Sequence, residues 1–194
     1  MFLSEPPADD AVRALRAKAE SDDGYVMNFV RLWAWRPDVH LAFSAARQLL
    51  ASTTLLSARE LAVLNSVTAA RIGDSYCSIA WGAKLADLSD AGTAAALLQG
   101  DDDPALTKRE RALVTWAAAV IEHPSGTTRE QVEALHAAGF SEREIFEATV
   151  FVAFRRAFCT VNGALGARPD RQLADESPPA ILSSVTYGRA VDGG

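Results

Sequence analysis

The chain has 194 residues, 49% hydrophobic and 23% charged, which is the composition of an ordinary globular domain with one substantial core. Its net charge of −6 and the lack of a basic stripe exclude a nucleic-acid-binding footprint. No apolar run reaches the ~18 residues of a membrane span. The opening segment MFLSEPPADD has no basic region ahead of an apolar core, so we expect no secretory signal and a cytoplasmic location.

Helix signals recur along the whole chain. Capping boxes, in which a Ser or Thr precedes a Glu or Gln by three residues, occur at Ser57–Glu60, Thr107–Glu110, Thr128–Gln131 and Ser141–Glu144. No stretch combines two-residue alternation with β-branched enrichment, so we predict an all-α fold. The predicted helices span residues 9–20, 25–35, 38–52, 58–72, 75–88, 108–122, 129–138 and 142–166, with bounds good to ~2–4 residues.

The first three helices carry one histidine, His40, on an amphipathic segment. Neither it nor His123 and His136 shares a metal-ligand spacing with the others, so we expect surface or capping roles for all three. The next helix opens with Leu56-Ser-Ala-Arg-Glu, and the closely similar Leu106-Thr-Lys-Arg-Glu opens the helix fifty residues later. Either an internal duplication or shared capping chemistry accounts for this repeat.

The break Gly73-Asp74-Ser75 is followed by a helix that carries Cys77 in its first turn. A thiol at a helix N-terminus is favoured as a thiolate by the dipole and the free backbone N–H groups. The functional interpretation is a nucleophilic or peroxide-reducing thiol, and the structural one is a small buried hydrophobe. Asp74 is predicted as the N-cap, and its carboxylate is expected to raise the pKa of the thiol rather than to act as a base.

The last predicted helix, 142–166, has little polar face. We therefore expect it to be central or buried in a homo-oligomer interface. Arg155 interrupts this apolar helix and is expected to pair with an acid or to cross a subunit interface, with an anionic-ligand role as the alternative. Cys159 on the same helix is interpreted as a packed core thiol rather than as a resolving partner for Cys77.

After Gly166 the composition changes to Pro, Asp, Ser and Gly with isolated apolar residues. We therefore predict a single all-helical domain over residues 1–166 and an irregular C-terminal tail over 167–194. The two cysteines form no metal-ligand spacing, and Asp101-Asp102-Asp103 lacks the spaced ligands of a calcium loop. We expect no metal and no cofactor.

Residues 25–170 resemble the alkylhydroperoxidase D-like / carboxymuconolactone decarboxylase family. The family pattern is a Glu, then a CxxC, then a His four residues past the second Cys. Here Tyr76, Cys77 and Gly82 stand at the family's Tyr, second Cys and Gly. Three positions depart from the pattern: Ala62 replaces the Glu, Asp74 the first Cys and Trp81 the His. Arg36-Pro-Asp, Leu106-Thr-Lys-Arg-Glu and the run from Ala137 to Gly166 extend the resemblance.

The resemblance implies an oligomer-forming multi-helix domain with peroxidase-type redox chemistry. We expect a peroxidase-related, antioxidant thiol oxidoreductase that acts through Cys77 alone, with Asp74, Tyr76 and Trp81 at motif positions around it. Losing the family's Glu, first Cys and His predicts weak activity on small peroxides. The alternative is a non-catalytic homo-oligomer of the same fold that binds a small molecule beside Tyr76 and Trp81. A lactone decarboxylase is third, because no histidine matches the required position.

Overall fold

The computed structural model describes residues 1–193, and within them the chain is all-helical, as the sequence predicted. The first helices are α1 (Asp10–Asp23), α2 (Asn28–Trp33), α3 (Pro37–Thr53), α4 (Ala58–Ile72), α5 (Ser75–Leu88) and α6 (Ala91–Gln99). The remaining ones are α7 (Lys108–Glu122), a 3-10 turn (Pro124–Gly126), α8 (Arg129–Ala137), α9 (Glu142–Ala164), α10 (Arg171–Glu176) and α11 (Pro179–Ser184). All eight helices predicted from the sequence are present, and α6, α10 and α11 are additional.

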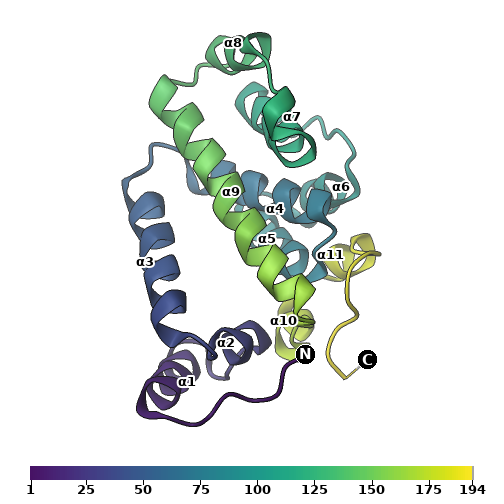
Figure 1. Ribbon diagram of the computed structural model, residues 1–194. Helices are drawn as coiled ribbons and strands as arrows, with labels where there is room; N and C mark the ends of the chain where they lie inside the picture. Colours follow the sequence, from purple (N-terminus) through teal and green to yellow (C-terminus); the bar gives the residue numbers. More distant parts are fainter. Residues whose placement is uncertain (194) are drawn as a thin grey trace.

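Helix α4 is the centre of the fold. Eight consecutive residues, Ala62 to Ala69, are buried on all sides of this helix. Helices α5, α6, α7 and α9 pack around it, and the long α9 crosses the molecule diagonally in Figure 1. A helix that is apolar on most sides is stable only where other elements cover it. The central position of α4 provides this cover.

The repeated Leu-x-x-Arg-Glu phrases meet at the paired starts of α4 and α7. Both capping boxes form, with Ser57 and Thr107 as N-caps. Arg59 Nε donates to Glu110 Oε1 at 2.6 Å, and Arg109 Nε donates to Glu60 Oε1 at 2.7 Å. Each capping carboxylate therefore receives the arginine of the other helix, and the repeat acts as a reciprocal clamp between the two central helices.

The N-terminal helices cover one side of this centre. Helix α3 runs beside α9 and buries only one of its 17 residues, His40. The prediction of a surface or capping role for His40 is wrong. The imidazole is 8% exposed, its ring centre lies 5.6 Å from that of Trp33, and its Nδ1 has no hydrogen-bond partner among residues 1–193. The pKa of His40 is lowered by burial, so the neutral ring is favoured.

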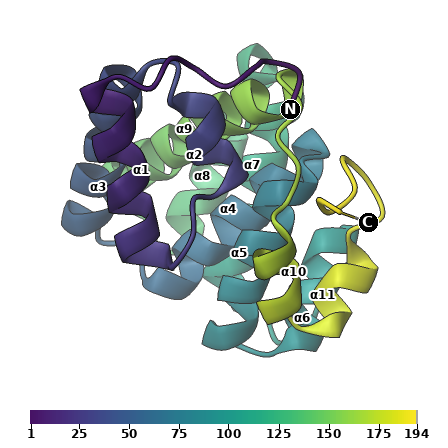
Figure 2. The same ribbon diagram turned by 90° about the horizontal axis from the view of Figure 1, so that it is seen from below.

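The sequence predicted an irregular tail over residues 167–194, and this prediction is wrong for part of the segment. Residues 171–176 and 179–184 form the helices α10 and α11. Helix α11 packs against α5 and α6, as Figure 2 shows from below. Its Ile181 is fully buried, and a Cβ added to Gly82 would lie only 3.0 Å from Ile181 Cγ2 and 2.6 Å from Leu98 Cδ1. A side chain at position 82 would therefore have to displace Leu98 on α6 and press against Ile181 on α11.

Helix α6 was missed because its apolar run, AGTAAALLQ, has no polar face to give a helical period. Its ends do carry local signals. The Asp90 side chain accepts a hydrogen bond from Thr93 N at 2.9 Å, and Gly100 closes the helix in the left-handed conformation at φ 85°. Within residues 1–193, no helix has both the length and the apolar composition needed to cross a bilayer.

Candidate functional site

The candidate site is built at the junction between α4 and α5. Gly73 ends α4 at φ 75°, a left-handed conformation that favours glycine, and the chain turns directly into α5. Asp74 is the N-cap of α5, as predicted, and its Oδ1 accepts a hydrogen bond from Cys77 N at 2.7 Å. Cys77 is consequently held at the third position of the helix, where the helix dipole favours an anion.

The Cys77 side chain is enclosed between α4, α5 and α9. The residue is 3% exposed and packs with Ala69, Phe158 and Cys159. Arg155 Nη1 donates a hydrogen bond to Cys77 Sγ at 3.4 Å. A guanidinium at this distance stabilises the thiolate over the thiol.

Arg155 itself is 4% exposed, and two uncharged side chains, Asn65 and Trp81, orient its guanidinium. Its Nε donates to Asn65 Oδ1 on α4 at 2.8 Å, and its guanidinium carbon lies 4.9 Å from the ring centre of Trp81. The sequence predicted an acidic partner or a subunit interface. Among residues 1–193 no carboxylate oxygen lies within 4.0 Å of the Arg155 guanidinium, so the prediction of an ion pair within the chain is wrong.

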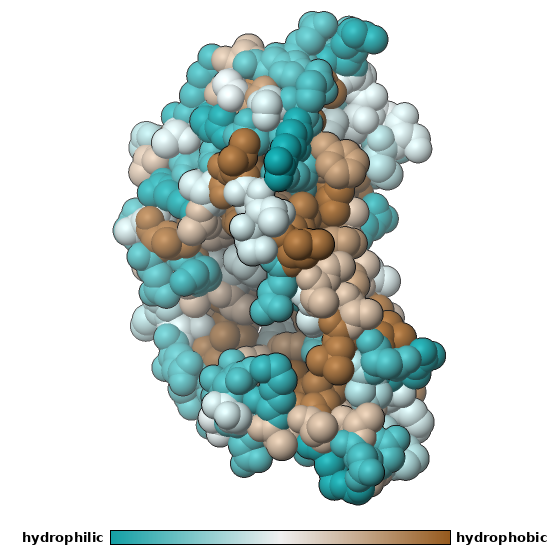
Figure 3. All heavy atoms as spheres, turned by 90° about the vertical axis from the view of Figure 1, so that its left-hand side faces the viewer, coloured by the Kyte–Doolittle hydropathy of each residue, from teal (hydrophilic) through white to brown (hydrophobic). Residues whose placement is uncertain are grey.

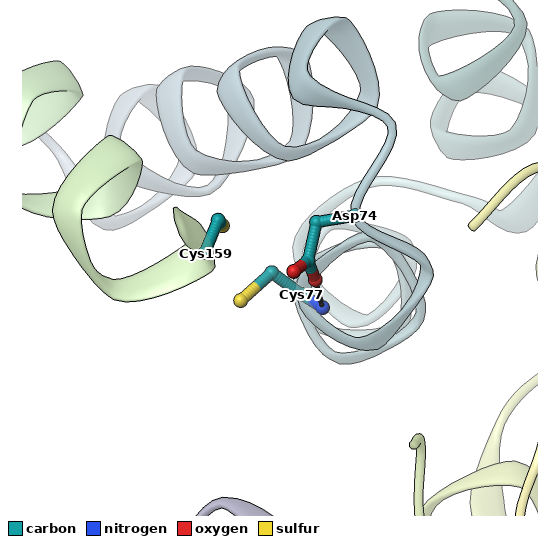
Figure 4. Close-up of side chains that lie close together, drawn as sticks. All are labelled: Asp74, Cys77 and Cys159. Carbon is teal, nitrogen blue, oxygen red and sulfur yellow. Dashed lines mark hydrogen bonds between the residues drawn. The ribbon is translucent and has the colours of Figure 1, made fainter. Parts of the chain in front are cut away.

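Cys159 on α9 faces Cys77 across the site. The two Sγ atoms and a carboxylate oxygen of Asp74 all lie within 4.8 Å of one another. Figure 4 shows the three side chains close together. Cys159 is 1% exposed, so its interpretation as a buried thiol is correct, but it is also a neighbour of Cys77 and not a remote core residue. Both cysteines are free thiols.

The two thiols differ in their protonation. The neighbouring Cys159 thiol and the charge of Arg155 lower the pKa of Cys77 below its usual value, against the opposing effects of burial and of Asp74. The pKa of Cys159 is raised by the proximity of Cys77 and by burial. Burial also raises the pKa of Asp74, against the hydrogen bond from Cys77. Of the two thiols, Cys77 is therefore the one whose thiolate the site favours, and Cys159 the one that holds its proton more strongly.

Asp74, Cys77 and Cys159 offer three potential metal-ligating atoms. The fixed positive charge of Arg155 lies against one of the sulfurs at 3.4 Å and disfavours a cation there. In addition, Asp74 Oδ1 is already engaged by a backbone N–H. The donor set is therefore better suited to sulfur redox chemistry than to metal binding.

The other residues at motif positions differ in how they contact the thiol site. The Tyr76 hydroxyl donates to Asp170 Oδ2, so Tyr76 anchors the segment after α9 and is not free for catalysis. Trp81 borders the site through its contact with Arg155. Ala62, at the family's Glu position, is fully buried in the main core. Asn65, one helical turn further on, is the α4 residue that reaches the site.

Two cavities flank the thiol pair. One of about 270 Å³ lies between α3, α4, α5 and α9, and its walls include Asn65, Trp81 and Arg155. Trp81 therefore forms part of the cavity wall and does not close it. A second cavity of about 560 Å³ is lined by Asp74 and Cys159, among others. The larger cavity thus reaches Cys159 directly, whereas the smaller one reaches Arg155, which donates to Cys77 Sγ.

Solved structures with the same fold are known. An alkylhydroperoxidase AhpD core, an uncharacterized peroxidase-related protein from Ralstonia eutropha JMP134, superposes with a TM-score of 0.75 at 24% identity, covering 89% of this chain and 93% of that chain. An uncharacterized peroxidase-related protein from Silicibacter sp. TM1040 gives a TM-score of 0.78 at 23% identity with the same coverage. This chain therefore has the AhpD-like fold.

The same fold also carries a different activity. The debrominase Bmp8 in its apo form superposes with a TM-score of 0.72 at 14% identity, covering 95% of this chain and 96% of its own. A cysteine-to-alanine variant of Bmp8 was solved in complex with 2,3,4-tribromopyrrole. No protein-family model matches the sequence, and no curated protein matches it.

Proposed function

We propose that this protein is a peroxidase-related thiol oxidoreductase in which Cys77 attacks the substrate and Cys159 resolves the oxidised product. The observation that carries the proposal is the position of the two sulfur atoms, within 4.8 Å of one another, with Arg155 on one of them. The shared fold of peroxidase-related proteins supports it. In this proposal Cys159 supplies the second thiol that the family has at the position of Asp74. The mechanism therefore uses two thiols, whereas the sequence alone led us to expect one.

The first step is attack of the Cys77 thiolate on the terminal oxygen of a hydroperoxide. The S–O bond forms, the O–O bond breaks, and the products are the Cys77 sulfenic acid and an alkoxide. The Cys159 thiol gives its proton to the alkoxide, which leaves as the alcohol. The stabilised thiolate of Cys77 and the retained proton of Cys159 are the protonation states that this step requires.

In the second step the Cys159 thiolate attacks the sulfur of the sulfenic acid. The S–S bond forms and hydroxide leaves, taking up a proton to become water. An external dithiol then reduces the disulfide by thiol–disulfide exchange and returns both cysteines to the starting state. Hydroperoxide is thus the oxidant and the dithiol the reductant. The non-catalytic binding protein is the alternative that the following experiment separates from this one.

The test treats wild type, Cys77→Ser and Cys159→Ser with one equivalent of tert-butyl hydroperoxide, followed by intact mass measurement without reductant. We expect wild type to lose two hydrogens through the disulfide. Cys159→Ser is expected to gain one oxygen, trapped by dimedone as the sulfenic acid, and Cys77→Ser to remain unchanged. Circular dichroism confirms that each variant is folded.

Steady-state turnover with dithiothreitol completes the test. Consumption of hydroperoxide that survives in Cys77→Ser would refute the thiol mechanism. A wild type that stays reduced under the same treatment would favour the non-catalytic alternative. A parallel assay with 2,3,4-tribromopyrrole in place of peroxide separates peroxidase from debrominase activity, because the two assays differ in the substrate offered to the same site.

A further inference from the structure

The cavity of about 270 Å³ beside Arg155 has an unusual lining. Helix α3 contributes Arg47 to its wall, and α9 contributes Arg155. The space between these two cations is bordered by aromatic rings from two helices. The aromatic residues are Trp81 on α5 and Phe151 and Phe154 on α9.

Neither arginine is paired with a carboxylate within residues 1–193. Over the described chain, 1–193, no carboxylate oxygen comes within 4.0 Å of the Arg47 guanidinium, just as none does for Arg155. Arg47 lies with its guanidinium carbon 5.1 Å from the ring centre of Phe158. Its nitrogens and the Nη2 of Arg155 have no hydrogen-bond partner among the same residues. Two cations therefore share a small cavity with unused donors.

Holding these charges together is costly for the empty protein. Burial and repulsion by Arg155 lower the pKa of Arg47 to about 10. A guanidinium gains most from a carboxylate, because the donor fork of the arginine matches the two carboxylate oxygens. An anion between the arginines would remove the repulsion and occupy the free donors.

We propose that this cavity binds a small carboxylate with an apolar body, the carboxylate contacting Arg47 and Arg155 and the apolar part lying against Trp81, Phe151 and Phe154. The proposal deepens the proposed function, since it names the substrate class of the same site: a carboxylate-bearing organic hydroperoxide. Arg155 would contact both the carboxylate in the cavity and the sulfur of Cys77. A bound carboxylate is therefore placed one side chain away from the Cys77 sulfur.

The test measures binding without turnover, in the Cys77→Ser protein, by isothermal titration calorimetry. The probes are benzoate and hexanoate, each paired with its neutral amide. We expect at least one carboxylate to bind about tenfold more tightly than its amide, the effect of one charge-assisted contact. Arg47→Gln is expected to remove this preference, and Arg13→Gln, which changes an exposed arginine on α1 outside this cavity, to leave it unchanged.

Three results would overturn the proposal: equal binding of acid and amide, an unchanged preference in Arg47→Gln, or no binding of either carboxylate at about 10 mM. A second measurement, the melting temperature of each variant with and without the probe, identifies a variant that has lost its fold. Because binding is read in a protein without the reactive thiol, failure here leaves the peroxidase mechanism intact. Conversely, binding without peroxide turnover would overturn the mechanism alone.

Discussion

At the level of single residues, the site depends on a buried cation whose charge is directed at sulfur. Burial of an unpaired guanidinium costs free energy. Here Asn65 accepts one donor of Arg155, the Trp81 ring covers its face, and Cys77 Sγ accepts another donor. The physical consequence is that the pKa of Cys77 depends on the charge of Arg155.

The first residue-scale prediction follows from this dependence. Arg155→Met removes the hydrogen bond and the positive charge, so the pKa of Cys77 should rise. Since one pKa unit is a tenfold change in thiolate fraction below the pKa, we expect alkylation of Cys77 by iodoacetamide to slow by roughly tenfold at pH 7. The rates of wild type and variant should converge as the pH rises above both pKa values.

Peptide mass mapping separates modification of Cys77 from that of Cys159. Arg156→Met is the matched control, because Arg156 is the exposed neighbour of Arg155 on the same helix and its side chain hydrogen-bonds only to Ile121 O among the described residues. Its alkylation rate should match that of wild type. A wild-type rate in Arg155→Met would show that the guanidinium does not activate the thiol.

At the level of elements, the capping boxes of α4, α7 and α9 serve two purposes. Each glutamate accepts a hydrogen bond from the backbone N–H of its own N-cap residue, and each also accepts one from an arginine on another helix. Arg109 joins Glu60 on α4 to Glu144 on α9, at 2.7 Å and 2.8 Å. Its guanidinium also covers the ring of Phe140, 3.7 Å from the ring centre. The capping glutamates thus also connect α4, α7 and α9 to one another.

The corresponding prediction compares two arginines that both bridge α4 and α7. Arg109→Met leaves two mostly buried carboxylates without their cation and should lower the free energy of unfolding by about 2 kcal/mol. Arg71→Met breaks only the exposed contact of Arg71 with Glu122 and should cost about 0.5 kcal/mol or less. Urea denaturation of the three proteins measures both values. Equal losses would contradict a specific role for the buried network.

At the level of the whole molecule, the side that carries α3 exposes several large apolar side chains. Helix α3 buries a single residue, and Leu41 and Leu49 on it are 51% and 66% exposed. Phe146 on α9 is 68% exposed. Figure 3 looks onto the side of α3 and shows apolar side chains gathered over this face. The sequence predicted a homo-oligomer that buries part of the last helix, and this face is the region we propose for the contact.

We expect sedimentation velocity at micromolar concentration to show an oligomer. The double change Leu49→Glu and Phe146→Glu should shift the protein to monomer while its circular dichroism spectrum stays helical, because both side chains are exposed within one chain. Ala137→Glu, at an exposed position on α8, is the control and should leave the oligomer intact. A monomeric wild type would contradict the prediction of an oligomer. An oligomer that persists in the double variant would place the interface elsewhere.

The sequence by itself determined eight of the helices and the place of the thiol. The starts at Ser57, Thr107, Thr128 and Ser141 were predictable because a capping box involves only four consecutive residues. The same locality placed Cys77 in the first turn of α5 and assigned Asp74 as its N-cap. The short helices α10 and α11 were missed, because their stability comes from packing and not from an intrinsic pattern.

Only the tertiary structure decided what surrounds the thiol. Cys159 and Arg155 reach Cys77 because α9 crosses the start of α5, and Asn65 reaches Arg155 because α4 lies beside both. Nothing in the period or capping of α9 indicated which helix its polar residues would face. Helix crossings depend on the packing of many apolar side chains at once, and a local sequence pattern does not encode them.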